Sequence, residues 1–249
     1  MTKMTWIKAG VVAAVWTFAL TLAPLLKGAD AGANRVVAGV LIAMTGRPLL
    51  QVPGSDAWEK LKLNQFVYEG DTLRTSSGEK AAVALVGGAE VRINERSVFV
   101  MESGGGRKPA SLSTKVGQAW TRLLHGRSTV QVRSALAVCS VRGTEADIDV
   151  GERMTVKVYE GLVDVFNDQG RQSLSAGQMT QVTGPGAAPQ APKTLAAGDV
   201  GDWQNGLKAV DVEKNIQRLN KEAVRTRALE LELDKGGQKK KIQLKFEKK

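Results

Sequence analysis

The chain has 249 residues, 43% of them hydrophobic and only 5% aromatic, a composition that fits a globular protein and argues against disorder throughout. The formal net charge of +10 suggests an anionic partner, but residues 1–33 and 34–206 carry +2 each while residues 207–249 carry +6, so the basic character belongs to the tail. Cys139 is the only cysteine, which excludes an intramolecular disulfide and metal sites built from paired thiolates. His125 is the only histidine, so any catalytic triad that uses a histidine would have to use this one.

The first 33 residues are typical of an export signal. Lys3 and Lys8 lie at the basic start, an apolar run of 18 residues follows at 9–26, and small residues at 29–33 offer cleavage sites. The run also reaches the length that spans a membrane, so an uncleaved anchor remains the alternative. In either case we expect the rest of the chain to be exported, to the periplasm, with an inner-membrane anchor if the segment is kept.

Residues 34–183 consist mainly of β-type runs separated by glycine and other turn residues, which predicts a mainly β domain. Gly87 and Gly88 form a favourable tight turn between two of these runs. The pattern of residues 111–125 does not decide between a strand and a short helix. The expected strands lie at residues 36–42, 49–52, 80–86, 90–100 and 128–132.

The clearest strand pattern lies at residues 138–166, where apolar side chains alternate with acidic and other polar ones. If the link after Val150 closes a hairpin, one register places Ile148 opposite Val156 and Asp147 opposite Lys157. This register predicts one buried and one solvated strand face. The solvated acidic face is where we would look for a ligand surface.

Several motifs, in order along residues 36–183, resemble the core signature of the FecR family. They are a Gly-Asp and Arg-Thr box at 68–75, a Val-Arg-Gly-Thr-Glu motif at 141–145, a strand with Tyr-Glu-Gly at 156–163 and an Ala-Gly-Gln motif at 176–178. The resemblance implies a sandwich or a short solenoid-like stack of antiparallel hairpins. Its motif residues are Gly70, Asp71, Arg74, Val141, Arg142, Gly143, Thr144, Glu160, Gly161, Gly177 and Gln178.

We interpret these motif residues as structural. Gly70 permits positive φ, and the Asp71 carboxylate can accept hydrogen bonds from nearby backbone N–H groups. Gly143 breaks the alternation as a bulge or a strand corner would, and Arg142 and Thr144 would tie neighbouring groups into that corner. We predict no catalytic, cofactor-binding or metal-binding residue and therefore no cofactor.

The last 66 residues are predicted to form a linker and an appendage. Residues 184–198 contain three prolines among small residues, which indicates a linker and a domain boundary. In the appendage at 199–249, a helix is expected to begin near Asp199–Asp202 and to run to about Arg227. Its apolar face consists of Leu207, Val210, Ile216, Leu219 and Ala223.

The end of the chain predicts a β-hairpin around a Gly236-Gly237 turn. The alternation places Leu231 opposite Ile242 and Glu232 opposite Lys241. An isolated hairpin is only marginally stable, so its apolar face needs a surface to dock on. The candidate partner-binding residues are Leu229, Leu231, Leu233, Ile242, Leu244 and Phe246.

The resemblance implies an envelope regulator, because FecR-like proteins relay the state of an outer-membrane receptor to a sigma factor through a cytoplasmic segment. Only eight residues precede the apolar run, so we expect no transfer of the sigma-factor activity. We therefore expect a non-enzymatic binding, scaffold or sensory module whose partner is an envelope protein or a wall polymer. A membrane-anchored signalling regulator and a cell-wall polymer-acting enzyme are the alternatives.

Two other functions are disfavoured by the residues themselves. Asp147 and Asp149 would place two carboxylates about 7 Å apart on one strand, as a glycoside hydrolase needs, but the strand alternation explains them without catalysis. Nucleic-acid binding by the lysine-rich end is disfavoured by export and by the lack of stacking aromatics there. Beyond an uncleaved anchor, membrane contact is expected only as weak attraction through the basic tail.

Overall fold

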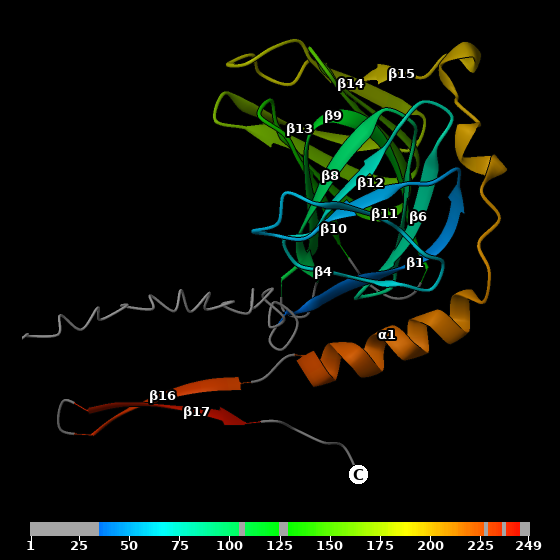
Figure 1. Ribbon diagram of the computed structural model, residues 1–249. Coiled ribbons are helices and arrows are strands. Elements are labelled where there is room, and N and C mark those ends of the chain that lie inside the picture. Colours follow the sequence, from blue (N-terminus) through cyan, green and yellow to red (C-terminus); the bar gives the residue numbers. More distant parts are fainter. Residues whose placement is uncertain (1–34, 105–107, 125–128, 227–228, 236–237, 245–249) are drawn as a thin grey trace, which may run out of the picture. The chain divides into compact units, whose positions relative to one another are not determined.

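A computed structural model describes residues 35–104, 108–124, 129–226, 229–235 and 238–244. Strands dominate these residues, as predicted (Figure 1). The strands are β1 (Val37–Thr45), β2 (Leu49–Gln51), β3 (Trp58–Lys60), β4 (Phe66–Tyr68), β5 (Thr72–Thr75), β6 (Lys80–Leu85), β7 (Ala89–Ile93), β8 (Ser97–Gly104), β9 (Ala110–Leu123), β10 (Val130–Arg133), β11 (Val138–Val150), β12 (Met154–Asn167), β13 (Gly170–Ser175), β14 (Gln178–Val182), β15 (Lys193–Thr194), β16 (Leu229–Lys235) and β17 (Gln238–Leu244).

The long strands β9, β11 and β12 each contribute to two layers of one continuous sheet. The first layer, here the β1 layer, joins β4, β1, β6 and β7 to the later half of β9, and continues through β11, β12, β14 and β15. The second, the β8 layer, joins β3, β2, β5 and β8 to the first half of β9, and continues through β10 to the other ends of β11 and β12 and to β13. Apolar residues of both layers, such as Leu41 and Val91 from one and Phe99 and Leu112 from the other, form a single buried core.

A glycine lies where each long strand passes from one layer to the other. Gly117 in β9 has φ +138° and Gly161 in β12 has φ +81°, conformations that L side chains rarely adopt. In β11 the pairing register shifts between Arg142 and Glu145, on either side of Gly143. The break in strand alternation predicted at Gly143, as a bulge or a strand corner, is therefore confirmed as a shift in register.

Local alternation predicted the pairing of the longest hairpin correctly. The β11–β12 hairpin has the expected register, with Ile148 opposite Val156 and Asp147 opposite Lys157. The ambiguous segment at 111–125 is strand β9 as far as Leu123. The expected single strand at 90–100 is wrong, because a turn in which Arg96 has φ +55° divides it into β7 and β8.

The segment expected as a linker follows the edge of the sheet. Asn167 donates from Nδ2 to the Ala187 carbonyl at 2.7 Å, and the Gln190 N–H donates to the Gln181 carbonyl at 2.9 Å. Further along, β15 pairs with β14. The proline-rich stretch thus extends the β domain at its edge, and a functional boundary at 184 stays a prediction.

The helix α1 (Val212–Thr226) begins later than predicted. Residues 197–211, here called the strap, instead form two short 3₁₀ turns, η1 (Ala197–Asp199) and η2 (Trp203–Gly206), and extended chain held against the sheet. The helix then packs Ile216, Leu219 and Ala223 onto β1 and β6. Val210, expected on the apolar face, lies before the helix and is exposed.

The terminal hairpin has the predicted register. Leu231 lies opposite Ile242 and Glu232 opposite Lys241, and β16 and β17 form a two-stranded sheet of their own. The side chains of this hairpin lie outside the described part of the chain. Phe246 and His125 lie outside it as well.

Candidate functional site

The first FecR-like motif is built into a turn between β4 and β5. Asp71 is fully buried, accepts a hydrogen bond from the Tyr68 N–H at 2.9 Å and forms an ion pair with Arg35. Burial raises the pKa of Asp71, and these two partners oppose the shift. Gly70 has φ +87°, and a Cβ there would meet Pro53 at 2.6 Å. The Asp71 carboxylate is thus enclosed by its own domain.

Arg74 and the other motif residues lie at separate places in the fold. The Arg74 guanidinium lies 4.0 Å from the Trp58 ring, and exposed Arg142 pairs with Asp164 at 3.1 Å. Val141 is buried, whereas Glu160 is exposed; Gly161 and Gly177 have positive φ.

The side chain of Gln178 accepts a hydrogen bond from the Ser175 N–H at 2.8 Å across the β13–β14 turn. The Thr144 side chain lies outside the described part. The motif residues that are described therefore lie in turns and within strands at separate places in the fold, and they do not converge on one site.

Asp147 does not lie on a solvated face, and that expectation is wrong. Its side chain is 2% exposed and accepts hydrogen bonds from Gln118 Nε2 at 2.8 Å and Trp203 Nε1 at 2.9 Å. Trp203 belongs to the strap, more than fifty residues further along the chain. The strap covers the outer face of the β1 layer, so burial raises the pKa of Asp147.

Basic side chains from several strands hold the strap by its backbone carbonyls. Lys157 Nζ donates to Asp199 O at 2.6 Å and Lys80 Nζ donates to Trp203 O at 3.0 Å. Arg92 donates to the Gln204 carbonyl. The contact between strap and sheet is therefore distributed across the layer.

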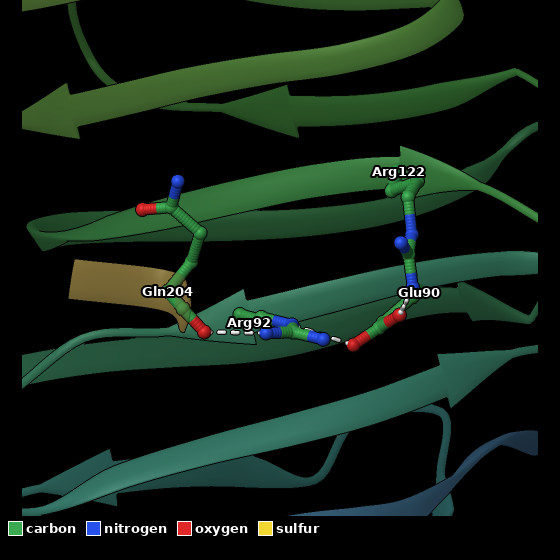
Figure 2. A network of polar contacts seen from close by, with 4 residues as sticks. All are labelled: Glu90, Arg92, Arg122 and Gln204. Atoms are coloured by element: carbon green, nitrogen blue, oxygen red, sulfur yellow. Dashed lines mark hydrogen bonds and ion pairs between the residues drawn. The ribbon is translucent and has the colours of Figure 1, made fainter. Parts of the chain in front are cut away.

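Figure 2 shows the buried part of this contact. The Glu90 carboxylate is fully buried. One of its oxygens accepts a hydrogen bond from Arg92 Nε at 2.6 Å, and the other accepts one from Arg122 Nη2 at 2.9 Å. Hydrogen bonds from basic side chains on both oxygens offset the cost of burying this carboxylate. Arg92 is thereby fixed between Glu90 and the strap residue Gln204.

Other candidate chemistry is limited within the described residues. Cys139 is buried in β11, and burial raises the pKa of its thiol far above the ordinary value, as expected of an inert core cysteine. No group of three or more His, Cys, Asp or Glu side chains that could hold a metal ion occurs in the part of the chain that is described.

Comparison with protein families identifies the β domain. Residues 71–164 match the family model described as FecR protein. The chain carries a FecR domain. The match extends from the Asp71 turn through β9, β11 and most of β12 to Asp164.

Two crystal structures of a protein from Parabacteroides distasonis ATCC 8503, described as a "putative anti-sigma factor", are similar to this FecR-domain chain. Both are 20% identical to it and cover 54% of it, with TM-scores of 0.47 and 0.48. The aligned part spans 65% and 64% of those chains, so less than two thirds of either is represented. Comparison with curated proteins gives no match.

A membrane anchor was expected only if the segment at 9–26 is kept, and that segment lies outside the described residues. In the part that is described, no helix combines the length and apolar character needed to cross a bilayer.

Proposed function

We propose that this protein is a non-enzymatic, FecR-type partner-binding module of the cell envelope, and that its terminal hairpin engages another envelope protein. The observation that carries the proposal is the pairing of β16 and β17 in a sheet separate from the sheet of the β domain. On this proposal, residues 34–183 form the scaffold and residues 199–249 attach the docking element to it.

The hairpin needs a partner for a physical reason. Its register places Leu229 opposite Leu244 and Leu231 opposite Ile242, and strand alternation assigns these residues to one face. Two strands alone are only marginally stable in water. Burying an apolar face on another protein would contribute roughly 25 cal/mol for each Å² removed from water, which supports docking over a free hairpin.

The β domain supports a scaffold better than an enzyme. Asp147, one of the two carboxylates weighed for hydrolysis, accepts hydrogen bonds from Gln118 and Trp203. A hydrolytic carboxylate needs access to its substrate and to water, and this one lies beneath the strap. A membrane-anchored signalling regulator is the second candidate function, and the FecR match favours it. Export to the periplasm remains part of the proposal.

The test is site-specific photo-cross-linking in cells with a photoreactive amino acid at position 231 or, on the opposite face, at position 232. We expect position 231 to give the same cross-linked protein repeatedly and position 232 to give little. The captured protein is then purified, and its affinity is measured for the exported chain and for a chain ending at Thr226. This end point keeps α1 on the sheet.

The matched variants change one face of the hairpin at a time. Leu231→Ser with Ile242→Ser should weaken binding at least tenfold, whereas Glu232→Gln with Lys241→Gln should have a small effect. If the chain ending at Thr226 binds the partner as tightly as the full chain, the hairpin is not the docking element and the proposal fails.

A further inference from the structure

A cleft of about 630 Å³ lies on the outer side of the β8 layer, away from the strap and the terminal hairpin in the sequence. It is formed by β8, the first half of β9 and the turn between β10 and β11. A hollow of this volume is large enough to take several side chains of a ligand.

The cleft is apolar because of strand alternation in β8. Phe99 and Met101 point into the core, so Val98 and Val100 face outward into the cleft. Val116, on the neighbouring strand, is 47% exposed. Valine at outward positions leaves an apolar floor that water covers in the free protein.

The surroundings of this floor carry a positive excess. Lys115 and Arg133 line the cleft, and an adjoining hollow of about 440 Å³ adds Lys108. Among the described residues that line the two hollows, Glu102 is the only acidic one; Arg133 contacts it at 3.3 Å and Ser111 donates a hydrogen bond to it at 2.9 Å. Glu102 is therefore already engaged, and the rim favours an anionic ligand.

We infer that the two hollows bind an extended acidic peptide segment of a partner protein. An apolar side chain of the peptide contacts Val98, Val100 and Val116, and flanking carboxylates contact Lys115 and Lys108. An extended peptide suits the site because alternate side chains point to opposite sides of its backbone, so apolar and acidic residues can meet different surroundings. This surface is distinct from the terminal hairpin.

The experiment uses a fluorescein-labelled eight-residue peptide of alternating Glu and Leu, with a Lys-Leu peptide of the same length as the charge control. Fluorescence anisotropy with the exported chain should show binding of the acidic peptide at least tenfold tighter than that of the basic one. Lys115→Glu should weaken this binding by about five- to tenfold, the size expected for reversing one exposed charge contact. Val116→Ser should weaken it further.

Leu162→Ser is the matched control, because Leu162 is 57% exposed but does not line the cleft. It should leave the affinity unchanged, and circular dichroism should show all variants folded. The chain ending at Thr226 should still bind the acidic peptide, which separates this inference from the role of the hairpin. Equal affinity for the two peptides overturns the inference, as does unchanged binding in the Lys115→Glu, Val116→Ser double variant.

Discussion

Asp71 is a single carboxylate that connects the start of the domain to the turn before β5. We predict that Asp71→Ala lowers the free energy of unfolding by about 2–4 kcal/mol, because Arg35 and the Tyr68 N–H both lose their acceptor. Urea denaturation measures the change. The exposed residue Asp56 provides the control, and Asp56→Ala should change stability by less than about 0.5 kcal/mol. Equal effects of the two substitutions would contradict this account.

The buried carboxyl of Asp147 should make stability depend on pH. Burial raises its pKa, so the folded protein keeps the proton to a higher pH than the unfolded chain does. The resulting stabilisation is present below the unfolded pKa of about 4 and is lost as the pH rises through the folded pKa. Asp147→Asn removes this dependence, so relative to the wild type the variant should gain stability as the pH rises from about 4 through the folded pKa of Asp147.

The measurement for Asp147→Asn is urea unfolding at several pH values. The substitution also removes one hydrogen-bond acceptor, which changes the free energy of unfolding by the same amount at every pH. The quantity to compare is therefore how the difference in free energy of unfolding between variant and wild type changes with pH. Asp168→Asn, at an exposed position, should run parallel to the wild type. A parallel curve for Asp147→Asn would show that its carboxyl does not titrate differently on folding.

The glycine corners set the shape of the long strands. Gly117 has φ +138°, and a Cβ there would lie 2.5 Å from the Ser97 Cβ and 2.8 Å from the Ser97 Cα. We predict that Gly117→Ala costs about 2 kcal/mol or more, because neither the backbone conformation nor the space admits a side chain. Gly151→Ala is the control, since nothing lies within 4 Å of its Cβ position. Thermal and urea unfolding should rank Gly117→Ala well below Gly151→Ala, and similar stabilities would be inconsistent with a tight corner.

The strap and α1 are needed by the whole domain. A chain ending at Gly184 loses the cover over Val40, Ile42, Ala82 and Ala84, whereas one ending at Thr226 keeps it. We predict that the shorter chain unfolds at a lower urea concentration and aggregates, because a contiguous apolar surface is exposed. The longer one should unfold close to the full-length protein. Indistinguishable unfolding of the two would show that the cover contributes little.

Sequence patterns predicted the parts of this molecule that depend on neighbours along the chain. The β11–β12 register follows from alternation that satisfies both faces at once, and the corner at Gly143 follows from its interruption. The burial of Asp147 could not be predicted in this way, because the strap that covers it comes from a distant segment. Trp203 in a polar stretch was the available signal, since a lone tryptophan there often has an apolar surface to cover. The open cleft depends on how three separate strands come together, which alternation alone does not specify.

The end of α1 returns to the start of the domain, where Thr226 Oγ1 accepts a hydrogen bond from the Val37 N–H at 3.2 Å. Because the two points lie together, tension applied between them would load the contact of α1 with β1 and β6 before it loaded the interior of the sheet. The helix would peel away from one end, breaking its contacts successively, while the two layers stayed unstretched. The domain is therefore mechanically arranged so that a pull on both flanking segments is first resisted by the helix.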